Sequence, residues 1–131
     1  MKKEVTQSHE LAYSIENWLD GILKVDMTDA AVAIVFNLYE DIGKNWSMEM
    51  VGASCFDEED SDWACDEVTD FGTRENPFTW NEDTDWEHVL WEVSAVITRY
   101  LSEGKYAEKL KQYEGIGIGF VDGDLEILYT K

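Results

Sequence analysis

Carboxylates are the most numerous side chains able to do chemistry in this sequence, and they concentrate in one part of it. Residues 57–92 hold 14 Asp and Glu side chains and one cation, Arg74. The net charge is −13 over 57–92, −5 over 1–56 and −1 over 93–131, which accounts for the chain's −19. A concentration of this kind suits cation binding or the recognition of a basic partner. It does not suit direct binding of nucleic acid, which depends on Lys and Arg, or of anionic membranes.

Calcium-type binding is the first candidate chemistry, and the spacing does not favour it. An EF-hand loop that begins at Asn81 would take as ligands Asp83, Asp85 and Glu92. Trp86 then stands where the loop requires glycine, and the residues from 86 onward have helical spacing. The sequence therefore predicts no cofactor and no dedicated metal site, and leaves open only a weak association of divalent cations with the carboxylates.

Zinc binding and cysteine catalysis have equally little support. The chain offers Cys55, Cys65, His9 and His88, without a closely spaced pair of the kind that zinc sites use. Asp85 and His88 have a helical spacing that suits a metal pair, but no second such pair completes a site. We expect two free cysteines. Because no segment suggests a pocket with polarised groups, we predict no catalytic residue and no enzymatic activity.

Glycines at 115, 117 and 119 resemble part of a nucleotide-binding fingerprint, but that fingerprint requires a helix after the glycines. Here Ile116, Ile118 and Phe120 alternate with them, as in a strand. The glycines would then form a strip without side chains on one sheet face. Such a strip allows a helix or a large indole to approach the sheet closely.

Helical spacing of apolar residues predicts two main helices. The first covers 8–23 and begins near Thr6 or Ser8, and the second covers 86–101. Thr84 and Glu87 have the spacing of a capping box for the second helix, and Gly104 would end it. A short helix is expected within 106–113.

Alternating and continuous apolar runs predict the strands. They lie at 31–39 and 46–56, joined by a hairpin loop at 41–45, with a less regular strand near 63–68 and a closing hairpin over 115–129. We therefore predict an α+β fold, an antiparallel sheet of four to five strands with helices packed on one face. Without a linker or repeat, residues 1–131 are expected to form a single domain.

Four of the six tryptophans, Trp63, Trp80, Trp86 and Trp91, lie within the acidic segment. A disordered acidic tail would lack large aromatic residues, so we expect this segment to be ordered. Helical periodicity assigns Trp86 to the core and Trp91 to a helix flank. Trp63 and Trp80 are the predicted exposed aromatic residues.

A solvated acidic surface that maintains solubility is the simplest interpretation of this segment. We favour a recognition surface, because the net charge exceeds what solubility requires and because tryptophan supplies anchor area at protein interfaces. The predicted partner-binding residues are Asp57, Glu58, Glu59, Asp60, Asp62, Trp63, Asp66, Glu67 and Trp80.

Two segments carry a resemblance to a known class. With Phe56-Asp-Glu-Glu-Asp-Ser-Asp-Trp63 after a strand and Gly119-Phe-Val-Asp-Gly-Asp-Leu-Glu126 in the closing hairpin, this small acidic chain resembles bacterial immunity proteins of polymorphic or contact-dependent toxin systems. The resemblance lies in architecture and charge. It implies a protein that binds a cognate toxin, often a basic nuclease, and occludes its active site.

The sequence thus predicts an immunity or inhibitor protein with a basic protein partner. Two alternatives are a DNA mimic that inhibits a DNA-binding protein and a small hydrolase dependent on a divalent metal. No apolar run is long enough for a transmembrane helix, and no signal-peptide stretch follows Met1, so we expect a cytoplasmic protein.

Overall fold

A six-stranded sheet organises the part of the chain that the computed structural model describes, which is residues 2–24, 31–65, 67–73, 76–121 and 123–131. Its helical elements are α1 (Lys2–Leu23), α2 (Trp86–Glu103), α3 (Ala107–Leu110) and the 3₁₀ helix η1 (Ser61–Cys65). Its strands are β1 (Ala33–Asp41), β2 (Asn45–Ala53), β3 (Glu67–Gly72), β4 (Phe78–Asn81), β5 (Gly115–Phe120) and β6 (Glu126–Thr130).

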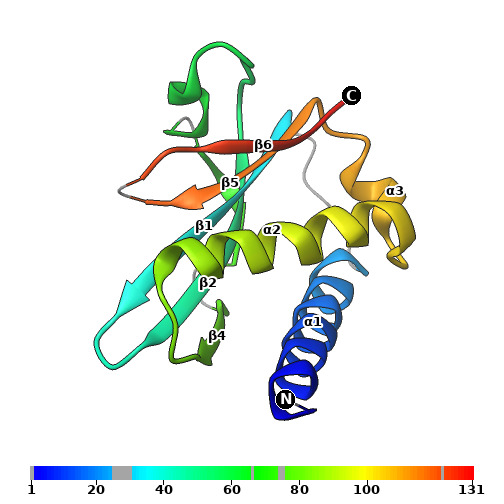
Figure 1. Ribbon diagram of the computed structural model, residues 1–131. Helices are drawn as coiled ribbons and strands as arrows, with labels where there is room; N and C mark the ends of the chain where they lie inside the picture. Colours follow the sequence, from blue (N-terminus) through cyan, green and yellow to red (C-terminus); the bar gives the residue numbers. More distant parts are fainter. Residues whose placement is uncertain (1, 25–30, 66, 74–75, 122) are drawn as a thin grey trace.

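The strand order is β3-β2-β1-β5-β6, with β4 pairing along the first half of β2 (Figure 1). Every pairing is antiparallel except that of β1 with β5, which is parallel. The α+β class is confirmed. The prediction of an antiparallel sheet of four to five strands needs two corrections. The sheet has six strands. One pairing is parallel, because the chain reaches β5 through α2 and α3, and a long crossover of this kind brings a strand back in the same direction.

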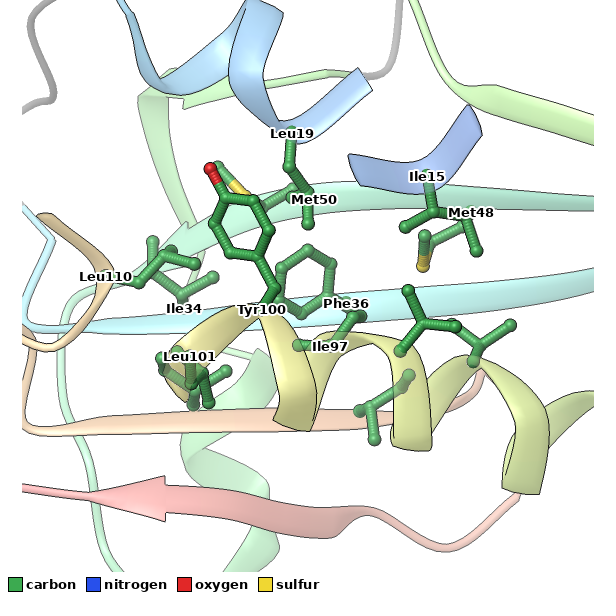
Figure 2. Close-up of a cluster of buried hydrophobic side chains, with 14 of the residues drawn as sticks. Ile15, Leu19, Ile34, Phe36, Met48, Met50, Ile97, Tyr100, Leu101 and Leu110 are labelled. Carbon is green, nitrogen blue, oxygen red and sulfur yellow. The ribbon is translucent and has the colours of Figure 1, made fainter. Parts of the chain in front are cut away.

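Both long helices cover one face of the sheet, as predicted (Figure 1). On that face Phe36 of β1 and Met48 and Met50 of β2 are fully buried. They pack with Ile15 of α1 and Ile97 of α2, among others, in one apolar core (Figure 2). This core positions the first turns of α2, and with them the candidate site.

Several local elements differ from the prediction. Helix α1 begins at Lys2 rather than near Thr6 or Ser8. The predicted strand near 63–68 is wrong at its start, because 61–65 forms η1 and the strand begins only at Glu67. Strand β4 was not predicted, since four residues directly after Pro77 give too short a pattern. The cap of α2 is Asp85 rather than Thr84, because the Asp85 carboxylate accepts the His88 N–H at 2.9 Å.

Tyr100 joins the two helices across this core. Its hydroxyl donates a hydrogen bond to Asp20 Oδ1 at 2.6 Å and accepts one from the Tyr106 backbone N–H at 3.2 Å. Burial, followed by the hydrogen bond to Asp20, raises the pKa of Tyr100 well above its ordinary value of about 10. The neutral phenol is therefore the form that stabilises the fold.

Replacing Tyr100 with phenylalanine should lower the free energy of unfolding by about 1.5–3 kcal/mol at pH 7, the usual contribution of a hydrogen bond to a charged group. Because the folded-state pKa is raised, the stability from Tyr100 is complete below pH of about 10 and is lost as pH rises toward the folded-state pKa. Urea unfolding at neutral and alkaline pH measures both effects. If the free energy of unfolding fell equally in wild type and in Tyr100→Phe as the pH rose above about 10, this role would be contradicted.

Candidate functional site

The acidic loop, residues 57–62, is fastened to the sheet face opposite the helices. Trp63 is 2 % exposed and lies in a second, smaller apolar core formed with β1 and β2. The ring of Phe56 meets it edge-on, with the centroids 4.9 Å apart. A Cβ at Gly117 would lie 3.2 Å from the Trp63 ring, and one at Gly115 would collide with Phe56. The prediction that the glycine strip admits a large indole is therefore confirmed.

The acidic residues of this loop are exposed to solvent. Two of their carboxylates also accept hydrogen bonds from the loop's own backbone. Asp57 Oδ1 accepts the Glu59 N–H at 2.9 Å, and Asp60 Oδ1 accepts the Asp62 N–H at 3.0 Å. These turns keep the chain out of an extended strand, which explains why η1 replaces the predicted strand. The loop brings together five of the predicted partner-binding residues, all of them exposed: Asp57, Glu58, Glu59, Asp60 and Asp62.

The remaining predicted partner-binding residues differ in position. Glu67 begins β3 and is half-buried, while Asp66 lies outside the described residues. Trp80 is half-buried in β4, where it packs against Phe78 with ring centroids 5.3 Å apart. Trp63 was expected to be exposed, and that expectation is wrong, because the glycine strip gives its ring a site within the fold. Trp63 thus fastens the acidic loop, and its direct contact with a partner stays a prediction.

The exposed tryptophans are instead on α2. Trp86 is 50 % exposed and Trp91 is 69 % exposed. The assignment of Trp86 to the core is wrong. Trp86 has the same helical spacing as the buried Val89 and Val93, but it is the first residue of α2. Its ring makes a T-shaped contact with Phe120, at 6.1 Å between centroids.

A groove of about 500 Å³ lies beside Trp86, which we call the Trp86 groove. Its apolar lining includes Leu38, Leu90, Phe120 and Val121, and its acidic lining consists of Glu40, Asp41 and Asp124. Neither the groove nor its acidic residues were predicted. The only signal in the sequence was the acidic pair at 40–41 that ends the first strand. This pair becomes part of a groove only because the distant β5–β6 turn packs beside it.

Residues of the β5–β6 turn contact both the small core under the acidic loop and the Trp86 groove. Leu125 packs against the small core that contains Trp63, while the adjacent Asp124 lines the Trp86 groove. We call the acidic loop and the Trp86 groove together the acidic face. It combines exposed carboxylates with an exposed indole. The sequence predicted this combination, but with Trp63 and Trp80 as the exposed residues rather than Trp86.

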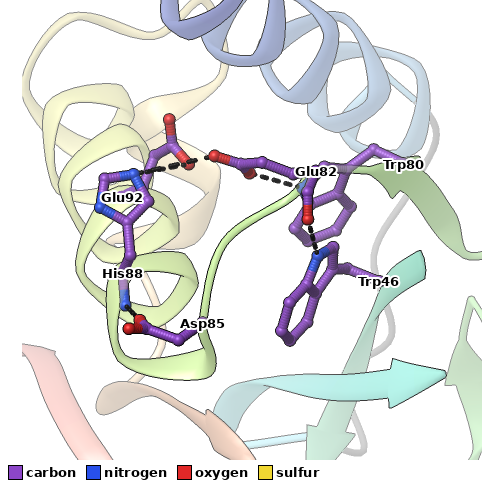
Figure 3. Close-up of polar contacts among 6 residues, drawn as sticks. All are labelled: Trp46, Trp80, Glu82, Asp85, His88 and Glu92. Atoms are coloured by element: carbon purple, nitrogen blue, oxygen red, sulfur yellow. Dashed lines mark hydrogen bonds and ion pairs between the residues drawn. The ribbon is translucent and has the colours of Figure 1, made fainter. Parts of the chain in front are cut away.

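A second group of polar residues lies at the other side of the start of α2 (Figure 3). The Trp46 indole donates to the Glu82 carbonyl at 2.9 Å, and the Trp80 indole donates to Glu82 Oε1 at 3.1 Å. His88 Nε2 lies 3.7 Å from Glu82 Oε2 and 3.7 Å from Glu92 Oε1. Trp80, Glu82, His88 and Glu92 line a groove of about 840 Å³ bounded by α1, β4 and α2.

Comparison with known proteins found no match among family models, curated proteins or solved structures. In the described part of the chain, no helix is both long and apolar enough to cross a membrane.

Proposed function

We propose that this protein binds a basic protein partner through the acidic face. The observation that carries the proposal is the position of Trp86, a half-exposed indole beside an apolar groove with Glu40, Asp41 and Asp124 in its lining. Large aromatic side chains in a groove supply most of the binding energy in many interfaces, while surrounding charges orient the partner and accelerate association. A partner with basic residues around an apolar projection has the complementary chemistry.

The charge distribution supports a basic protein rather than solvent as the counterpart of this surface. The loop carboxylates of Glu58, Glu59 and Asp62 are exposed, and no ion pair involves them among the described residues. By contrast, carboxylates near α3 and the end of α2 have nearby cations, as in the pairs Arg99 with Glu103 at 3.8 Å and Lys111 with Glu108 at 3.5 Å. The acidic loop thus retains an uncompensated field that a basic partner would neutralise.

The resemblance to bacterial immunity proteins gives this partner a class. In our proposal the chain acts in the cytoplasm as an inhibitor that covers the active site of a cognate toxin domain, such as a basic nuclease. Carboxylates of the acidic loop would occupy positions that nucleic-acid phosphates otherwise take. An immunity protein should bind that one domain selectively, whereas a DNA mimic should bind several unrelated basic proteins.

The proposed activity is tested by expressing a toxin domain encoded beside this gene with and without the chain. We expect the domain alone to arrest growth and co-expression to restore it. Equal growth arrest with and without the chain, or neighbouring genes that encode no toxic basic domain, would contradict the toxin assignment.

Steering by the acidic loop predicts a loss of association rate when its charge is reduced. The triple variant Glu58→Gln, Glu59→Gln, Asp62→Asn removes three charges, so the net charge changes from −19 to −16, and keeps Asp57 and Asp60 for the turns. We expect association in stopped-flow measurements to slow by about 10-fold at low salt and to depend less on ionic strength.

The matched control removes three charges from α1, α2 and α3, by the changes Glu16→Gln, Glu103→Gln and Glu108→Gln. Its net charge is also −16, so an effect of total charge alone would slow both variants equally. We expect the control to associate within about twofold of wild type, since its charges lie away from the acidic face. Equal slowing of the two variants would refute local steering.

A further inference from the structure

We infer that Glu82, His88 and Glu92 form a binding site for one divalent transition-metal ion of the zinc class. The three side chains offer an imidazole nitrogen and two carboxylate oxygens that all lie within 4.8 Å of one another. The site is separate from the acidic face and does not depend on the proposed partner.

The separations between these atoms fit coordination better than direct hydrogen bonding. His88 Nε2 lies 3.7 Å from an oxygen of Glu82 and 3.7 Å from an oxygen of Glu92, beyond the range of about 2.7–3.2 Å for a hydrogen bond. Ligand bonds of about 2.0–2.2 Å around a tetrahedral ion place neighbouring ligand atoms about 3.4 Å apart. Small side-chain rotations would therefore suffice to close all three ligands around an ion.

Hydrogen bonds with Lys44, Trp46 and Trp80 hold Glu82 in place. Its carbonyl accepts from the buried Trp46 indole, and its N–H donates to the Lys44 carbonyl at 3.0 Å. Its carboxylate accepts from the Trp80 indole through Oε1, which leaves Oε2 toward His88 (Figure 3). A hydrogen bond that orients a ligating carboxylate is the usual second-shell support of a metal site.

The other two ligands stand one turn apart on α2, with His88 and Glu92 at i and i+4. The Asp85 carboxylate caps this helix through the His88 N–H, so the first turn that carries the imidazole is fixed. Glu92 is 9 % exposed, and Glu82 is half-buried. Two carboxylates at this depth repel each other, and a divalent cation between them would neutralise both.

The donor set and the groove indicate the kind of ion. Imidazole nitrogen favours zinc-class ions, whereas Ca²⁺ and Mg²⁺ prefer oxygen ligands alone. Three protein ligands leave a fourth position of a tetrahedral site for water. All three ligands line the groove of about 840 Å³, whose wall also includes Glu10 and Ser14 of α1 and which would give water access to the ion.

Calorimetric titration of chelator-treated protein with Zn²⁺, in an excess of Mg²⁺, tests the site. We expect one Zn²⁺ per chain, with affinity at least about 10-fold lower in His88→Ala and in Glu82→Gln. Trp80→Phe, which retains the ring but loses the indole N–H, should weaken binding by about 10-fold through the orientation of Glu82. Circular dichroism checks that each variant is folded.

The matched control is Glu58→Gln with Glu59→Gln, which removes two carboxylates from the acidic loop and none from the site. We expect it to bind Zn²⁺ as wild type does. Wild-type affinity in His88→Ala, or equal losses in His88→Ala and the loop control, would overturn the inference and indicate diffuse association with acidic residues or coordination elsewhere. In wild type, the imidazole NMR signal of His88 should change when Zn²⁺ is added. An unchanged imidazole signal at saturating Zn²⁺ would overturn the inference as well.

Discussion

Replacing Trp63 with alanine is expected to lower the free energy of unfolding by about 3–5 kcal/mol, the range for truncating a large buried aromatic side chain. Trp63 is 2 % exposed and is the largest side chain in the small core on the sheet face opposite the helices. The glycine strip cannot collapse to fill the space, because Gly117 has no side chain to move into it. Urea unfolding followed by circular dichroism measures the loss.

Trp63→Phe is the matched control for this prediction. It retains an aromatic ring against Phe56 and the strip and removes an indole N–H that has no hydrogen-bond partner among the described residues. We expect it to cost less than half of what Trp63→Ala costs, since no buried hydrogen bond is lost. A cost within about 0.5 kcal/mol for Trp63→Ala, typical of a surface position, would show that the acidic loop is not fastened in this way.

Replacing Trp86 with alanine is expected to weaken binding of the basic partner by about 30-fold or more, equivalent to about 2 kcal/mol for an interface anchor. The stability of the free protein should change little, since half of the side chain is already exposed. Calorimetric titration with the partner measures the affinity. The effect should appear mainly in the dissociation rate, whereas the loop variant affects association.

Trp91→Ala is the matched control on the same helix. Trp91 is 69 % exposed and is not among the residues that line the Trp86 groove. We expect its replacement to change the affinity by less than about threefold, as for most residues outside an interface centre. The opposite order, with Trp91→Ala more damaging than Trp86→Ala, would place the interface elsewhere on α2.

Regular elements could be predicted from the sequence where local pattern determines them. The periodicity of α2 and the alternation of β5 identified both elements, because each buries one face against the same core. The parallel pairing of β1 with β5 could not be predicted in this way. It depends on how the crossover through α2 packs, and no residue in either strand encodes direction.

The tryptophans illustrate what local pattern omits. Trp63 stands among carboxylates, which suggests exposure, yet its binding surface is a glycine strip more than 50 residues further along the chain. The sequence predicted that the strip would admit a helix or a large indole, but not which element or residue would fill it. Trp86 has core periodicity, but periodicity does not reveal that a helix begins there and that its first residue stays half-exposed.

The proposed metal site was missed for a related reason. The spacing of His88 and Glu92 at i and i+4 was available in the sequence, but Asp85 was considered as the partner of His88 instead. Asp85 caps the helix and is thereby occupied. Glu82 comes close only because the turn between β4 and α2 folds back and is held by Trp46, which no local pattern indicates.

The most direct test of the central claim is a ¹H–¹⁵N NMR spectrum of the labelled chain with and without its unlabelled basic partner. The account predicts that the Trp86 indole signal and the amides of the acidic loop and of residues 123–125 shift or broaden. The Trp91 indole and the amides of α3 should keep their positions. Changes confined to α1 and α3, with the Trp86 indole and the acidic loop unperturbed, would contradict binding through the acidic face.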